Sequence, residues 1–174
     1  CGCKAVQGGG FIDLYQLWRT PGRAEALRVL LGGVLSEPGN AGYSRAANEL
    51  VVTSARRLSL AAWVPGVREL LLLASGELPR DAFAGLPLTA CNVHPRADLP
   101  PPAPFVDAGT GWRPCRLIGV FRTSARHSTR RSAALIDAAF VIEDPITAVL
   151  EQIRVTPAEH AIVVAGAVEP VAAQ

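Results

Sequence analysis

The sequence predicts a layered α/β or α+β fold, a single domain built around a mixed sheet. Its 174 residues fall within the usual length of one domain. Hydrophobic residues make up 49% of the chain and charged residues 18%, so there is enough apolar surface for a core. Strand-like and helix-like patterns alternate along the chain, as expected for layers of helices and sheet. This architecture supports many unrelated functions and selects none of them.

The first third of the chain predicts a strand followed by a helix. Phe11–Trp18 is rich in aromatic and branched residues, which favours a strand. Thr20 and Pro21 are suited to an N-cap and a first helical position. The predicted helix covers residues 21–35 and ends near Pro38. The following residues are spaced to share one helical face: Leu27, Leu30, Leu31 and Val34.

The middle of the chain is predicted to be rich in strands. Residues 50–53 are strand-like, and apolar residues alternate with others over 58–63. The apolar run 67–74 suits a buried strand, although its leucines leave a helix open as the alternative. One helical turn is expected over 79–86, and a further strand over 88–93.

The last third begins with a proline-rich internal loop and continues with strands and helices. Five prolines between 94 and 104 predict a loop there. A strand is predicted over 116–123, and a helix or a strand over 132–142. Asp144-Pro145 begins a second amphipathic helix over 145–154, and Ala161–Val168 is rich enough in Val and Ile to predict a final strand. The apolar face of the 145–154 helix consists of Ile146, Val149, Leu150 and Ile153.

Composition also bounds the location of the chain. The longest dense apolar stretch, Leu70–Ala74, is far too short to span a bilayer. A chain of this length folds without disulfides, so reduced cysteines and a cytoplasmic location are favoured. Lys4 is the only lysine, which is typical of a GC-rich genome. Because the first residue is not methionine, we expect a fragment or a processed chain.

The most prominent candidate site is an arginine-rich segment at 113–131. Between Asp107 and Asp137 there is no acidic residue, although the whole chain carries a net charge of only +2. Guanidinium groups bind phosphate and carboxylate in a bidentate manner, and hydroxyls can add hydrogen bonds. The segment contains these basic residues: Arg113, Arg116, Arg122, Arg126, His127, Arg130 and Arg131.

This segment predicts a non-catalytic binding or structural-interaction domain with an anionic partner. The partner would be a protein, a phosphate or carboxylate ligand, or nucleic acid. Because no aromatic residue lies between Phe121 and Phe140, a stacking platform for single strands is not predicted. The alternative is a solvated segment whose arginines pair with the acidic C-terminal part of the chain.

A second hypothesis is a cysteine hydrolase with His160 as its base. His160 precedes the apolar run 161–166, and this placement resembles that of the general base in papain-like cysteine hydrolases. The resemblance implies a nucleophile at Cys1, Cys91 or Cys115, because a cysteine becomes a useful thiolate when a base lies nearby. Cys1-Gly2 also resembles the start of class II glutamine amidotransferases, which would make a processed Cys1 the nucleophile.

A third hypothesis is a zinc-stabilised module. Cys1, Cys3, Cys91 and His94 supply four ligands of the kinds that tetrahedral zinc uses. No other cofactor is expected. Gly8-Gly9-Gly10 precedes the first predicted strand and so forms no dinucleotide cradle, and Gly109-Thr110-Gly111 lacks the Lys and Ser of a phosphate loop.

Overall fold

The computed structural model describes residues 27–36, 41–79, 81–96, 99–109, 114–122 and 130–167. For 41–44, 130–131 and 167 only the backbone is described. The predicted strand Phe11–Trp18 lies outside these residues, as do Cys1 and Cys3.

The strands form three small sheets, one of which is mixed as predicted. β1 (Val29–Leu31) and β2 (Ala62–Val64) are parallel, and β3 (Val93–Pro95) pairs antiparallel with β6 (Phe140–Ile142). The mixed sheet has the order β4-β5-β7, with β4 antiparallel and β7 parallel to the central β5. Its strands are β4 (Phe105–Gly109), β5 (Pro114–Phe121) and β7 (Ala161–Ala167).

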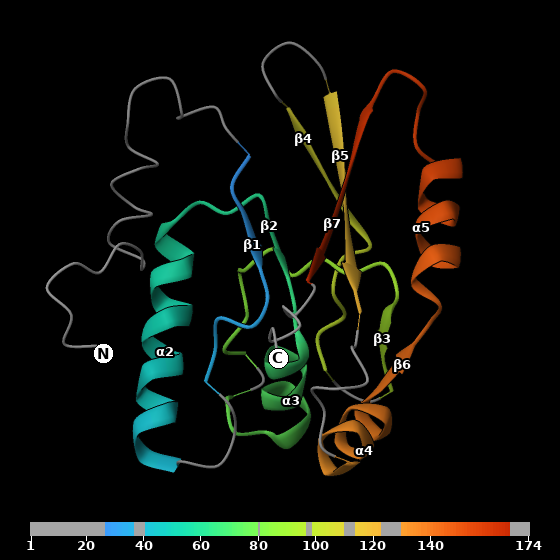
Figure 1. Ribbon diagram of the computed structural model, residues 1–174. Helices are drawn as coiled ribbons and strands as arrows, with labels where there is room; N and C mark the ends of the chain where they lie inside the picture. The colour runs from blue at the N-terminus through green and yellow to red at the C-terminus, as the bar shows by residue number, and fades with distance from the viewer. Residues whose placement is uncertain are drawn as a thin grey trace, which may run out of the picture.

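Helices lie on both sides of these strands (Figure 1). The helix α2 flanks β1 and β2, while α5 lies on the opposite side of the molecule, beside β5. The strands β1, β2, β5 and β7 all run from the top of Figure 1 to the bottom, so their carboxyl ends gather at one edge, where α3 and α4 lie. The bounds are α2 (Ala41–Arg57), α3 (Val67–Ser75), α4 (Arg130–Ala139) and α5 (Pro145–Arg154).

The predicted helix over 21–35 is wrong in its described part, because Val29–Leu31 is the strand β1. Leu30 is buried and Leu31 is exposed, which is the alternation of a strand. The helical spacing of the leucines came from a short apolar run, and such a run fits either structure. Pairing with Ala62–Val64, 33 residues later in the chain, decides the outcome.

Two strands predicted in the middle of the chain are also helical. Residues 50–53 lie within α2, where Val52 is buried in the core and Val51 packs against it, while Leu50 is exposed. The run 67–74 forms α3, in agreement with the alternative that leucine favours. α3 begins at Gly66 and ends at Gly76, which has a left-handed backbone (φ 68°).

The later elements agree more closely with the sequence. α5 has the predicted bounds, and the Asp144 side chain accepts the backbone N–H of Thr147 at 2.8 Å. This N-cap hydrogen bond lowers the pKa of Asp144. The segment 132–142 was predicted to be a helix or a strand. It contains both, since α4 leads directly into β6. The final strand is β7.

The main core lies between α3, α2 and the short strands. Trp63 is fully buried and meets Phe83 edge to face, with ring centroids 5.5 Å apart. Phe121 and Phe140 close the core on the side of β5 and β6. Among the described residues, no helix is long and apolar enough to cross a membrane.

Candidate functional site

The carboxyl ends of the parallel strands form the most distinctive edge of the molecule. The loop 32–36 leaves β1 there, Pro65-Gly66 leaves β2, and Arg122 follows the end of β5. In open α/β sheets, ligands bind outside the carboxyl ends of the strands. This edge is therefore the first place to look for a site.

A buried carboxylate occupies the part of the edge next to β1 and β2. Glu69 is fully buried in the first turn of α3. Its oxygens accept the backbone N–H of Gly33 at 2.9 and 3.1 Å, of Val34 at 3.2 Å and of Leu35 at 3.3 Å. The N–H of Gly66 donates to the same carboxylate at 2.9 Å. The loops thus form a nest of N–H groups of the kind that binds anions. Here the bound anion is the carboxylate of Glu69, which belongs to the protein itself.

Glycines make this arrangement possible. A Cβ on Gly32 would lie 2.0 Å from the backbone nitrogen of Gly66, so the two loops touch through their backbones. Gly33 has φ +87°, a conformation that L side chains rarely adopt. Arg68 braces the loop by donating to the carbonyls of Gly33 and Leu35, both at 3.4 Å. We did not predict this site. Its signals were Gly32-Gly33 after an apolar run, and a glutamate three residues after Gly66.

Arg116, one of the predicted binding residues, is engaged within the protein. It is buried in the amino-terminal half of β5, and its Nε and Nη2 donate to the two oxygens of Asp107 at 2.7 and 2.8 Å. Its Nη1 reaches the Val155 carbonyl and the Thr156 hydroxyl, and its Cζ lies 3.7 Å from the centroid of the Phe105 ring. The hydrogen bonds from Arg116 lower the pKa of Asp107.

Arg122 differs from Arg116, since it is exposed and lies at the carboxyl edge. The residues after it connect β5 to α4, which begins with Arg130 and Arg131. Their side chains are not among those described. The remaining predicted binding residues, Arg113, Arg126 and His127, lie outside the described residues.

β5 therefore places the arginines of the 113–131 segment in two different environments, one at each end of the strand. Arg116 belongs to the amino-terminal half, where it pairs with Asp107, and Arg122 stands at the edge where ligands are expected.

Cys115 and His160 lie at the amino-terminal ends of β5 and β7, away from this edge. Burial raises the pKa of the Cys91 thiol to about 11, so Cys91 is a thiol and a poor nucleophile at neutral pH. Cys115 is also buried, and it pairs across β5 and β7 with Ala161, the residue after His160. The buried Nδ1 of His160 has no hydrogen-bond partner among the described residues. The hydrolase hypothesis stays a prediction for Cys91, for Cys115, and for Cys1, which lies outside the described residues.

Of the four predicted zinc ligands, the structure describes Cys91 and His94, and these two lie in different environments. Cys91 is buried in a small cluster with Ile118 and Ala148, whereas His94 is exposed with its Nε2 3.4 Å from the Glu143 carboxylate. Within the ranges that the structure describes, no three His, Cys, Asp or Glu side chains are grouped as metal ligands. Because Cys1 and Cys3 lie outside them, the zinc hypothesis stays a prediction.

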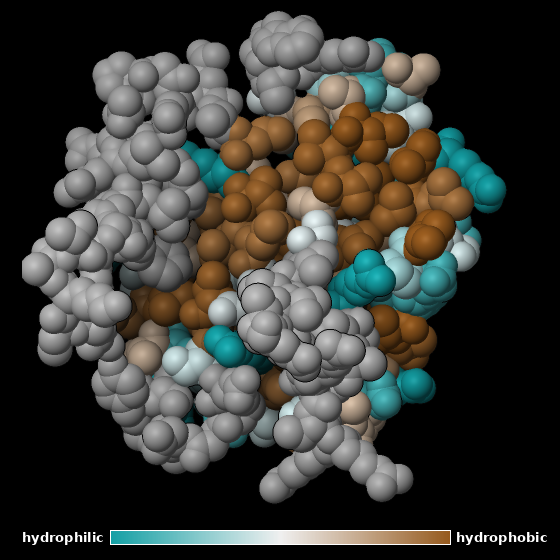
Figure 2. Space-filling model, in the orientation of Figure 1, coloured by the Kyte–Doolittle hydropathy of each residue, from teal (hydrophilic) through white to brown (hydrophobic). Residues whose placement is uncertain are grey.

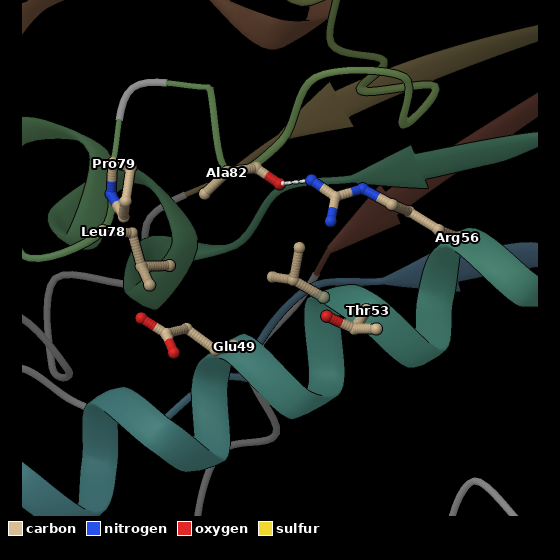
Figure 3. Close-up of a pocket in the computed structure, with 7 residues that line it drawn as sticks. Glu49, Thr53, Arg56, Leu78, Pro79 and Ala82 are labelled. Atoms are coloured by element: carbon tan, nitrogen blue, oxygen red, sulfur yellow. Dashed lines mark hydrogen bonds between the residues drawn. The ribbon is translucent and has the colours of Figure 1, made fainter.

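A surface pocket of about 250 Å³ lies between α2 and residues 78–82 (Figure 3). Val52 and Leu78 form its apolar wall. Its charged groups already have partners within the protein, since Arg56 donates to the carbonyls of Ala82 and Ala84, and Glu49 pairs with Arg45 at 3.0 Å. The pocket therefore offers a ligand few open polar groups.

Comparison with known proteins shows a likeness of fold alone. No family model matches the chain, and no similar curated protein is found. The solved structures that are similar in fold include the following two. The sulfate thiohydrolase SoxB of Thermus thermophilus has a TM-score of 0.66 at 15% identity, over 90% of this chain and 29% of that one. The NAD nucleotidase NadN of Haemophilus influenzae has a TM-score of 0.54 at 13% identity, over 90% and 30%. The chain thus spans less than a third of either structure.

Proposed function

We propose that this domain is a non-catalytic binding unit that holds an oxyanion at its carboxyl edge, through Arg122 and the arginines that follow it. The observation that carries the proposal is the position of Arg122. β5 ends at Phe121, so the arginine-bearing segment leaves the sheet at the edge where parallel strands place ligands. Arg122 is exposed there, and a guanidinium group suits phosphate, sulfate and carboxylate equally well.

The engagement of Glu69 supports a binding role over a catalytic one. Acid–base catalysis needs a carboxylate that can reach a substrate. Glu69 is fully buried, and four backbone N–H groups already bind it. Glu69 therefore stabilises the fold.

The names of the similar structures support an oxyanion as the ligand. One is named for sulfate and the other for a nucleotide, and both of these carry oxyanion groups. Since the likeness is one of fold over part of each chain, we propose only this class of ligand.

Calorimetric titration with pyrophosphate tests the proposal. We expect binding that weakens as salt increases, because the contacts are exposed charges. Arg122→Ala should weaken it about tenfold, and the triple variant Arg126→Ala, Arg130→Ala, Arg131→Ala should weaken it further. The matched control is Arg57→Ala, which removes the same charge at the end of α2, on the opposite edge of the molecule.

Three outcomes are informative. Loss of binding in the Arg122 variant alone supports a site at the carboxyl edge. An equal loss with Arg57→Ala means that net charge is being measured, and the proposal is then wrong. No effect from any of the four arginines also contradicts it.

A further inference from the structure

The outer edge of β7 is an open strand with apolar side chains on both of its faces. Among the described residues β7 is the last strand of the mixed sheet, paired only with β5. Ile162, Val163 and Val164 are 40%, 40% and 50% exposed. Successive strand residues point to opposite faces, so three half-exposed neighbours mean that both faces of β7 are partly open at these residues, although β7 also contacts β1 and β2.

β7 also lacks the features by which proteins protect an edge strand. Its sequence, AIVVAGA, contains no charge and no proline. Native edges usually carry a charge, a proline or a bulge, which prevents pairing with another chain. The opposite edge of the same sheet has such a feature, because β4 carries Asp107 at its centre. Of the two edge strands of this sheet, β7 is therefore the one without a charged residue.

The neighbouring helix α5 turns its apolar residues outward as well. Ile146, Leu150 and Ile153 are 69%, 46% and 37% exposed, although their spacing gives them one face of the helix. The buried residue of α5 is instead Ala148. Figure 2 shows hydrophobic residues gathered over the region of β7 and reaching towards α5. A contiguous apolar surface of this extent marks an interaction site.

We propose that a second copy of this chain covers this surface, with β7 of one copy pairing antiparallel with β7 of the other. Antiparallel pairing centred on Val164 sets only uncharged side chains opposite one another. A two-fold axis uses the same patch on both copies, so a patch that is uncharged and apolar throughout is complementary to itself. The two mixed sheets then become one continuous sheet.

Charge and size favour a second copy as the occupant. The net charge of +2 gives little repulsion between copies. Homodimer interfaces have more apolar cores than other interfaces, and a typical interface buries about 800 Å² of each partner. β7 and α5 together expose six large apolar side chains, which would form the apolar centre of such an interface. The inference does not depend on the proposed anion site, which lies at another edge.

Light scattering after size exclusion, from low micromolar to several hundred micromolar protein, tests the dimer. We expect a mass that rises towards twice 18.3 kDa with concentration. Val164→Lys places a charge on the open edge and should raise the dissociation constant at least tenfold. The control Leu50→Lys changes a residue that is 67% exposed on α2 and should leave the dissociation constant unchanged.

Hydrogen exchange supplies a readout that does not depend on a variant. The outward-facing amides of β7 should become protected as the protein is concentrated, while those of β4 should not. A monomer at every concentration overturns the proposal, and so does a dimer in which β7 exchange is unchanged. A Val164→Lys variant that is folded by circular dichroism and as dimeric as the original chain overturns it too.

Discussion

The backbone N–H of Gly33 points between the two oxygens of Glu69, at 2.9 and 3.1 Å, across 36 positions of sequence. This contact joins the loop after β1 to the first turn of α3. Because Glu69 also binds the N–H of Gly66, one side chain fixes both loops at the carboxyl edge. Without it, the N–H groups of the two loops would lose their partners.

Glu69→Gln should lower the free energy of unfolding by about 2–4 kcal/mol, because an amide has one oxygen and its NH₂ group would face N–H donors. Urea unfolding at neutral pH measures the change. The control Glu49→Gln alters an exposed glutamate on α2 and should cost less than about 0.5 kcal/mol. Equal effects of the two substitutions would contradict the role assigned to Glu69.

Gly119→Ala should destabilise the protein by about 3 kcal/mol, because the added Cβ would lie 2.0 Å from the carbonyl oxygen of Thr89. β5 and the segment before β3 would have to separate. Gly109→Ala is the matched control, since nothing lies within 4 Å of its Cβ. Thermal unfolding of the two variants should differ clearly, and similar midpoints would mean that this close approach is absent.

The Asp107–Arg116 pair should make stability sensitive to acid. The folded protein holds the pKa of Asp107 below its usual value, so it binds a proton there less readily than the unfolded chain does. The stabilisation is therefore complete above the ordinary pKa of about 4 and is lost as the pH falls through the lowered value. Asp107→Asn should remove this part of the pH dependence. A variant whose urea midpoint falls with acid as steeply as that of the original chain would refute the prediction.

Cys91 should react slowly in the folded protein and make stability fall in alkali. Its pKa is about 11 against 9.0 for a free thiol, so the folded state keeps the proton in a range where the unfolded chain loses it. The free energy of unfolding should therefore decrease from about pH 9 to about pH 11, and Cys91→Ala should remove that decrease. Iodoacetamide labelling mapped by mass spectrometry measures the reactivity. Rapid labelling of Cys91 at pH 8 without unfolding would contradict this prediction.

Local signals in the sequence predicted α5 and β7 well. Asp144 and Pro145 fix the start of α5 through groups that lie within one turn, and such signals need no knowledge of the rest of the chain. β1 shows the opposite case. Its three residues are a strand because a distant segment pairs with them, which no local pattern of leucines could indicate.

The candidate site was predictable only in part for the same reason. Sequence places the arginines of the 113–131 segment together, but β5 carries Arg116 and Arg122 to different surroundings. Whether a guanidinium group is available to a ligand depends on whether an acceptor lies on the neighbouring strand, as Asp107 does for Arg116. The part played by Glu69 was missed, because its N–H donors come from a loop that is distant in sequence.

Glu69 also decides which dissolved anions this edge can accept. A carboxylate attached to the same chain competes for the N–H groups of Gly33 and Gly66 at an effective concentration far above that of any solute. Free phosphate therefore cannot displace it, and the nest is closed to ligands while the fold is intact. Because this nest is filled by the protein's own carboxylate, an oxyanion bound at Arg122 as proposed would not compete for the N–H groups that hold the two loops in place.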